Sequence, residues 1–224
     1  MKPIKKYLVL VLSISIIFFL SGCFNQTSTE EKIYKTLENV IQLEKEFANL
    51  QEPLLELEKK EKELYDTMLS LGLKEEEKIA ELADEAITVS NQRKEHLDQE
   101  RESIKKSEEE FIKVSELIEK LEDENLRKEA ENLFNLMETR YDLHKQLYEV
   151  YMEAITYDQE LYTMFKEMAS LGDMQDQVEK INNMYEKIYE LNEKFNEVTD
   201  QYNDAKLNFY KNAGLDVKLK ENES

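Results

Sequence analysis

The sequence predicts an all-α fold: an elongated bundle of about four long antiparallel helices with coiled-coil-type packing. Two observations support this prediction. The 224 residues include only four Gly and two Pro, and 36% are charged. Long helices have this composition, whereas sheets and tight loops need many more turn residues. Apolar residues also recur at steps of three and four along much of the chain, which places them on one face of each helix.

The first helix should begin near Ser28, which has capping-box spacing to Glu31. It should end at Gly72, a residue type that commonly follows the last turn of a helix. Pro53 lies inside this segment and is expected to kink the helix or split it in two. The second helix should open with the acidic residues 75–77, since negative charge favours a helix N-terminus.

The middle of the second helix has a narrow apolar face. Between residues 90 and 110 only Leu97 and Ile104 are large and apolar, so we expect weak packing and the greatest mobility there. The third helix should cover residues 124–170. Its boundary with the second, at 122–125, contains neither Gly nor Pro. Without a turn at this point the two helices would fuse into one rod of roughly 140 Å.

The fourth helix, predicted over residues 173–212 and stopped at Gly214, has the clearest periodicity. Its apolar positions advance by three or four residues throughout: Met174, Val178, Ile181, Met184, Ile188, Leu191, Phe195, Val198, Tyr202, Ala205 and Phe209. This spacing is typical of coiled-coil packing. The predicted bundle therefore spans residues 29–215, and residues 216–224 are expected to form a disordered tail.

The N-terminal residues 1–22 have the features of a lipoprotein signal peptide. Three lysines precede an apolar run from residue 7 to residue 20, which at about 14 residues is shorter than the ~20 of a membrane span. The run leads into the lipobox Leu20-Ser21-Gly22-Cys23. The alternative is an uncleaved N-terminal anchor that happens to be followed by a cysteine.

Cys23 is the only cysteine of the chain, so no internal disulfide explains it and lipidation does. Two acyl chains (a palmitate-type diacylglycerol) on one residue satisfy the two-signal requirement for stable anchoring. We therefore expect a lipidated tether over residues 23–28. This places the protein on the extracytoplasmic face of the cell membrane, in the cell-wall zone.

The net charge excludes one class of partner. The chain carries a formal net charge of −20, and loss of residues 1–22 removes three lysines and no acid, which gives −23. A nucleic acid needs a basic protein face that can release its counterions, so no nucleic-acid partner is expected. An acidic membrane surface is equally unfavourable for the helices, so the membrane partner must be reached through the lipid on Cys23.

Sequence motifs for catalysis, cofactors or metals are not apparent, and we expect no enzyme activity. The two histidines are His96 and His144, and Arg93 and Tyr141 stand three residues before them. The Glu-x-x-His pairs of di-metal bundles are therefore absent. His144 lies on the apolar face of the third helix and is expected to be a hydrogen-bonded core residue. There is no Gly-rich phosphate loop and no serine in a strand-to-helix elbow.

Tyrosine is the unusual feature. Five tyrosines fall within the third helix: Tyr141, Tyr148, Tyr151, Tyr157 and Tyr162. One interpretation is a wide aromatic core whose hydroxyls reach the edge of the bundle. The other is an amphipathic strip that stacks on sugar rings or on a partner helix. Candidates for wall or partner contact are Tyr148, Tyr151 and Tyr157, of which Tyr157 lies off the core stripe.

Several segments together resemble a known family. They are the lipobox 20–23, Glu31-Lys-Ile-Tyr-Lys35, Gln51-Glu-Pro-Leu-Leu-Glu-Leu-Glu58, Ser70-Leu-Gly-Leu-Lys74, Asn192-Glu-Lys-Phe-Asn196 and Phe209-Tyr-Lys-Asn-Ala-Gly-Leu215. In this order and spacing they resemble the YkyA-like cell-wall-binding lipoproteins of Gram-positive bacteria over essentially the full chain. The resemblance implies an extracytoplasmic, lipid-anchored protein assigned to the cell wall. It supplies no catalytic or binding residues.

Two functions remain as hypotheses. In the first, the protein binds the cell wall, namely peptidoglycan, without catalysis. Wall teichoic acids are anionic and repel such an acidic chain, so binding needs sugar stacking, peptide-stem contacts or bridging cations. In the second, the protein is a surface scaffold or adaptor whose helices bind a membrane protein partner, for example at the narrow apolar face of residues 90–110.

Overall fold

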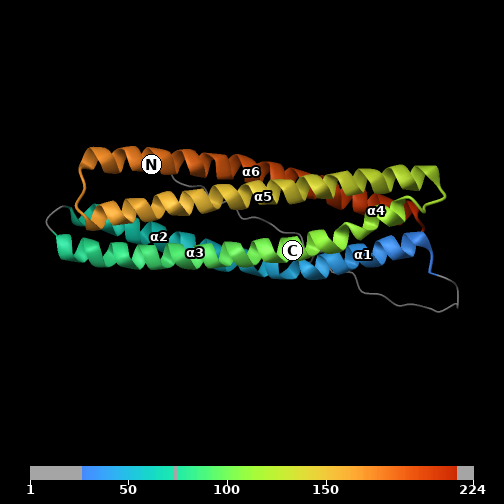
Figure 1. Cartoon of the computed structure of the whole chain (residues 1–224), viewed down its shortest axis with the longest axis horizontal. Coiled ribbons are helices and arrows are strands. Elements are labelled where there is room, and N and C mark those ends of the chain that lie inside the picture. Colours follow the sequence, from blue (N-terminus) through green and yellow to red (C-terminus); the bar gives the residue numbers. More distant parts are fainter. Residues whose placement is uncertain (1–26, 73–74, 216–224) are drawn as a thin grey trace.

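The computed structural model describes residues 27–72 and 75–215. In these ranges the chain forms helices and no strand: α1 Thr29–Leu43, α2 Lys45–Leu71, α3 Glu76–Phe111, α4 Lys113–Ile118, α5 Glu124–Lys166 and α6 Leu171–Asn212. α1 with α2 forms one bent rod and α3 with α4 another, so four long rods pack side by side with alternating direction (Figure 1). The predicted all-α bundle is confirmed.

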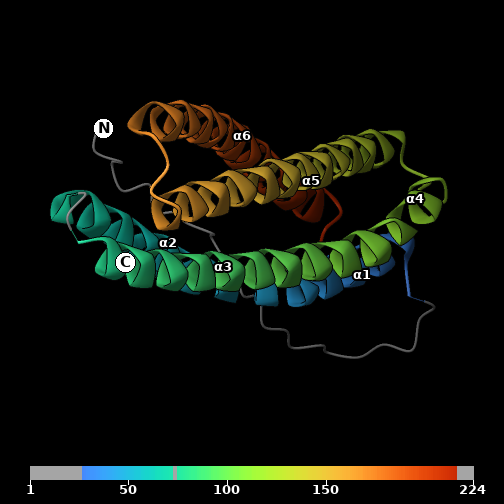
Figure 2. The ribbon, with the colours of Figure 1, turned by 60° about the vertical axis from the view of Figure 1, so that its left-hand side comes forward.

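The rods pack mainly in chain order. The closest helix pairs are α2–α3, α3–α5 and α5–α6, and the turned view shows α5 between α6 and the α2–α3 hairpin (Figure 2). The start of α1, the α4–α5 connection and the end of α6 lie together at what we call the proximal end (Figure 1). The end of α2, the start of α3 and the α5–α6 connection lie at the opposite, distal end (Figure 1). No helix in the described ranges is long and apolar enough to cross a bilayer.

Side-chain caps define three helix starts. Ser28 Oγ accepts a hydrogen bond from the main-chain N–H of Glu31 at 3.2 Å, as the capping-box spacing predicts. Asp123 Oδ1 accepts from Asn125 N–H at 2.8 Å and starts α5. Ser170 starts α6 in the same way. The cap at Asp123 turns the chain where neither Gly nor Pro is present, so the single long rod is not formed.

The bend between α1 and α2 lies at Glu44, not at Pro53. Ser103 of α3 inserts its hydroxyl there: Oγ donates to the carbonyl of Leu43 at 2.8 Å and accepts from the N–H of Phe47 at 3.2 Å. These are the two groups that would bond directly in an uninterrupted helix, and such an insertion is a known cause of bending. α2 continues through Pro53, which is exposed.

The face of α3 between residues 90 and 110 is buried. Alongside Leu97 and Ile104, the interior holds five polar residues: Ser90, Arg93, Glu100, Ser103 and Ser107. The expected weak packing is therefore not found, because polar side chains fill the space where apolar ones are missing. The apolar and aromatic residues of the core form separate clusters towards the proximal and distal ends.

Candidate functional site

The three candidate tyrosines do not form one face. Tyr148 is half-buried, and its hydroxyl donates to Asp98 Oδ1 of α3 at 2.6 Å. Tyr151 is half-buried and packs against the core. Tyr157 lies in a groove beside α6. Nine residues along a helix correspond to about two and a half turns, so Tyr148 and Tyr157 point to opposite sides of α5. Tyr141 and Tyr162 are buried, as the core interpretation predicts.

Tyr157 belongs to a shallow groove of about 400 Å³ between α5 and α6. The other lining residues come from α6: Lys180, Asn183, Met184, Glu186, Lys187 and Glu190. The Tyr157 hydroxyl donates to Glu153 Oε1 at 2.9 Å, and this bond to a carboxylate raises the pKa of Tyr157. The phenol therefore stays neutral, and its ring is held at the rim of the groove.

Gln177 holds the two helices together beside this groove. It is 1% exposed, and its Nε2 donates to the Tyr157 carbonyl at 3.0 Å and to Glu160 Oε2 at 2.9 Å. Lys180 Nζ donates to Gln177 Oε1 at 3.3 Å. A buried amide whose donors and acceptor are engaged favours one arrangement of its neighbours. The spacing of α5 and α6 at Tyr157 is therefore set by specific polar contacts.

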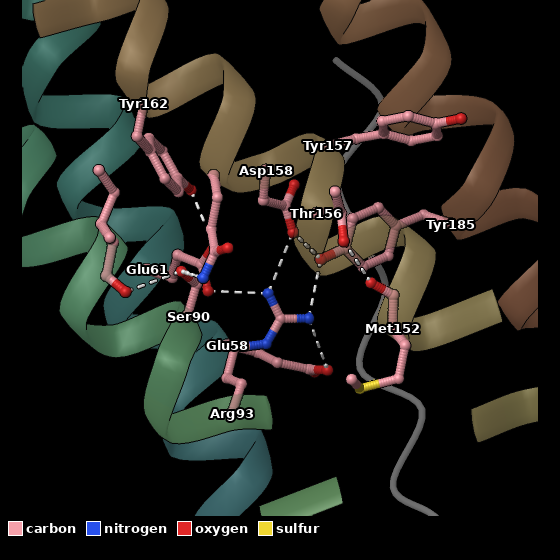
Figure 3. A network of polar contacts seen from close by, with 12 residues as sticks. Glu58, Glu61, Ser90, Arg93, Met152, Thr156, Tyr157, Asp158, Tyr162 and Tyr185 are labelled. Carbon is pink, nitrogen blue, oxygen red and sulfur yellow. Dashed lines mark hydrogen bonds and ion pairs between the residues drawn. The ribbon is translucent and has the colours of Figure 1, made fainter. Parts of the chain in front are cut away.

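An ionic network lies inside the bundle, on the other side of α5 (Figure 3). Arg93 of α3 is 1% exposed. Its Nη1 donates to Glu61 Oε2 of α2 at 2.8 Å and to Asp158 Oδ2 of α5 at 3.2 Å. Its Nη2 donates to the hydroxyl of Tyr185 of α6 at 2.9 Å. One guanidinium therefore joins all four rods.

Carboxylates outnumber cations around Arg93. Glu58 lies 3.6 Å from its Nη2 and adds a third acid to Glu61 and Asp158. Burial raises the pKa of Asp158 to about 6, and the neighbouring Glu61 charge adds to the shift while Arg93 opposes it. Burial also raises the pKa of Glu58. The hydroxyls of Tyr185 and Tyr162 donate to Asp158 and Glu61 at 2.9 and 3.0 Å, which offsets part of the desolvation.

Glu100 extends the acidic interior along α3. It is 4% exposed and accepts a hydrogen bond from Gln51 Nε2 at 2.8 Å. Burial, followed by the charge of Glu58, raises the pKa of Glu100 to about 8. Within the described ranges no group of three or more His, Cys, Asp or Glu residues has the geometry to hold a metal ion. These buried acids hold the rods together through hydrogen bonds and ion pairs.

A second network secures the bend at Glu44. Arg140 of α5, 4% exposed, donates to Glu44 Oε1 at 2.8 Å. The same oxygen accepts from Ser107 Oγ of α3 at 2.7 Å. Arg140 also lies over the ring of Phe195 of α6, at 4.9 Å from its centroid. The bend is therefore connected to the other three rods through charge and through a cation–π contact.

His144 is a core residue. It is 5% exposed and lies 5.4 Å from Phe47 and 6.1 Å from Phe195 between ring centroids. Its Nδ1 has no hydrogen-bond partner, so the hydrogen bond expected of a core histidine is not made at that atom. Burial, with Arg140 and Arg101 nearby, lowers the pKa of His144 to about 3. The imidazole is therefore neutral at physiological pH.

The charged residues inside the bundle were not predicted from the sequence, although the spacing of the buried positions along α3 indicates them. The buried positions of α3 advance by four and three residues: Ala86, Ser90, Arg93, Leu97, Glu100, Ile104, Ser107 and Phe111. This heptad continues through the stretch that is poor in apolar residues and places Arg93 and Glu100 at interior positions. A charged residue at such a position needs an opposite charge or hydrogen bonds from a neighbouring rod.

The lipobox residues Leu20, Ser21, Gly22 and Cys23 lie outside the described residues, as does the tail 216–224. A family model described as "Putative cell-wall binding lipoprotein" matches residues 28–212, which is most of the chain. The chain belongs to the YkyA family. The match begins at the N-cap of α1 and ends at the last residue of α6, so it spans the whole bundle.

A solved structure shares the YkyA fold seen here. It is the crystal structure of a conserved Staphylococcus aureus protein of unknown function, with a TM-score of 0.70 and 21% sequence identity. The alignment covers 84% of this chain and 98% of that one. At this identity the likeness shows a common fold alone. A search of curated proteins finds no match.

Proposed function

We propose that this protein is a lipid-anchored, extracytoplasmic rod that binds peptidoglycan without catalysis. The observation that carries the proposal is the family match over the whole bundle, whose description names both a lipoprotein and cell-wall binding. The lipobox ending at Cys23 supports the lipoprotein part from the sequence itself. Domains follow from it: a signal peptide over 1–22, a lipidated tether over 23–28 and a binding rod over 29–215.

The geometry suits a rod that projects from the membrane. α1 begins at Thr29, and the five residues between Cys23 and this helix span at most about 18 Å. The proximal end is therefore tied near the bilayer. The 42 residues of α6 extend roughly 60 Å, so the distal end reaches that far into the wall zone. An acidic membrane surface repels the acidic helices and disfavours a rod that lies flat.

A sedimentation experiment tests this function. The lipid-bearing protein, purified in mild detergent, is mixed with purified wall sacculi that retain or lack teichoic acids, across a range of salt and calcium concentrations. We expect binding that persists without teichoic acids and is weakened only modestly by salt, because most of the contact is with uncharged sugar groups rather than with fixed charge. Absence of binding under every condition would overturn the proposal. Release by a calcium chelator would instead indicate bridging cations.

The adaptor hypothesis loses its structural motivation. It depended on the narrow apolar face of residues 90–110, which was expected to accept a foreign helix. Arg93, Glu100 and Ser103 on that face bond to other rods of the same chain, so the site is occupied from within. A protein partner stays a prediction, which crosslinking in intact cells tests.

A further inference from the structure

We propose that the α5–α6 groove at Tyr157 binds a glycan segment of peptidoglycan in which the lactyl carboxylate of N-acetylmuramic acid is free because no peptide stem is attached to it. The inference rests on the proposed function and assigns it a site. Three properties of the groove support it: a positioned aromatic ring, polar groups without partners among the described residues, and a local pair of lysines on a strongly acidic protein.

The aromatic ring of Tyr157 is positioned before any ligand arrives. Its hydroxyl bonds to Glu153, its carbonyl bonds to Gln177, and the side chain packs against both large core clusters while staying half-exposed. Figure 3 shows the ring directed away from the ionic network, on the side of α6. A fixed aromatic face can stack on the C–H face of a pyranose with little loss of side-chain entropy.

The polar groups of α6 that face this ring are free to bind. Asn183, Lys187 and Glu190 are exposed and make no hydrogen bond or ion pair with another residue of the described chain. The side-chain amide of Asn183 can both donate to and accept from the acetamido group of an amino sugar. The carboxylate of Glu190 can accept hydrogen bonds from sugar hydroxyls. Sugar-binding sites combine such a polar set with an aromatic platform.

Two lysines that line the groove favour a ligand that carries a carboxylate. Lys180 and Lys187 lie seven residues apart on one face of α6, and neither forms an ion pair within the described residues. Glu186 and Glu190 line the same groove, and Glu153 and Glu160 lie beside it. A polyphosphate chain such as teichoic acid would meet these carboxylates along its length. A mostly neutral glycan with a single carboxylate would meet one lysine and avoid the repulsion.

The test measures binding of defined fragments to the detergent-purified lipoprotein by calorimetry. The probes are a muramyl-containing tetrasaccharide released from purified peptidoglycan and freed of its peptide stems, a chitin tetrasaccharide that lacks the carboxylate, and purified teichoic acid. We expect the muramyl fragment to bind at least about tenfold more tightly than the other two. Equal binding of the chitin fragment would overturn the role of the lysines. Preference for teichoic acid would overturn the assignment of the groove to a glycan.

Variants locate the site. Tyr157→Ala and Lys187→Gln are each expected to weaken binding of the muramyl fragment about tenfold, and Tyr157→Phe, which keeps the ring, should retain it. Matched controls on α6 are Tyr189→Ala and Lys194→Gln, both exposed and outside the groove. Lys187 is exposed, so its replacement should leave the fold intact even if Tyr157→Ala does not. Unchanged binding in Lys187→Gln and Tyr157→Ala, or equal loss in the controls, would overturn the site.

The two proposals fail differently. If the wild-type protein binds sacculi but the groove variants bind them equally well, the proposed function stands and the groove is wrong. If the wild-type protein binds neither sacculi nor fragments, the proposed function itself is wrong.

Discussion

The hydroxyl of Ser103 on α3 donates a hydrogen bond of 2.8 Å to the main-chain carbonyl of Leu43, at the end of α1. The same oxygen accepts from the N–H of Phe47. A side chain sixty residues away along the sequence thus occupies one position in the main-chain ladder of another rod.

Ser103→Ala should destabilise the protein by about 1–3 kcal/mol, because the carbonyl of Leu43 and the N–H of Phe47 lose their shared partner inside the bundle. Urea unfolding followed by circular dichroism measures the change. Ser70→Ala is the matched control, since the exposed hydroxyl of Ser70 bonds only to a carbonyl in its own turn. If both variants unfold at the same urea concentration, the inserted hydroxyl does not support the bend.

Pro53→Ala should stabilise the protein, by up to about 3 kcal/mol, since alanine restores a main-chain donor to an exposed helix interior. The bend should remain at Glu44, because Ser103 and Arg140 hold it there. A crystal structure of the variant checks the second part. A straight rod from residue 29 to residue 71 would show that Pro53 causes the bend.

Arg93→Ala should cost about 3–5 kcal/mol at pH 8, because it leaves Glu58, Glu61 and Asp158 without their counter-charge in the interior. The loss should shrink at pH 5, where carboxyls with raised pKa values take up protons. Thermal and urea unfolding at both pH values tests this. Lys94→Ala, at the exposed neighbouring position, should change little. A pH-independent loss for Arg93→Ala would contradict the explanation.

Glu100→Gln should stabilise the protein at alkaline pH. The folded chain raises the pKa of Glu100 from 4.5 to about 8, so it binds this proton more tightly than the unfolded chain does. The contribution of protonated Glu100 to the stability of the folded chain is complete below pH 4.5 and is lost as the pH rises to about 8. The variant removes that loss, so the gain in stability should be about 5 kcal/mol at pH 8.5, from a pKa raised by about 3.5, and small at pH 4.5.

Glu95→Gln, an exposed position on the same helix, serves as the control for Glu100→Gln and should show no such pH dependence. Burial of His144 changes the pH dependence of stability in the opposite direction. Its pKa is lowered to about 3 in the folded state, so stability falls as the pH drops from about 6.5 towards 3. Equal stabilisation of Glu100→Gln at both pH values would indicate a packing effect instead of removal of a buried charge.

Local chemistry allowed much of the fold to be predicted. The starts at Ser28 and Asp123 depend on side chains that bond to N–H groups two or three residues later, and such contacts are visible in a single sequence. Gly72 ends α2 with a φ of 65°, which glycine adopts without steric cost. The lipobox and the acidic composition are equally local, so the predicted lipoprotein class came from the residues alone.

The candidate site could be predicted only in part. The off-stripe position of Tyr157 on α5 was apparent from the helical period, and the structure places this residue in a groove. The same helical period also predicts that Tyr148 and Tyr157 lie on opposite sides of α5. The groove itself needed α6, because Lys180, Asn183 and Lys187 meet Tyr157 only once the two helices pack. The spacing of residues within α5 does not show which residues of α6 will lie beside Tyr157.

By itself, the sequence determined the helical class, most helix ends and the apolar part of each interior face, because these depend on contacts within a turn or two. Only the tertiary structure decided where the first rod bends and which charges are buried together. Ser103 meets Leu43, and Arg93 meets Glu61, Asp158 and Tyr185, across separations of 32 to 92 residues in sequence. Such pairings depend on which rods become neighbours and in what register, and that is settled by packing of the whole bundle.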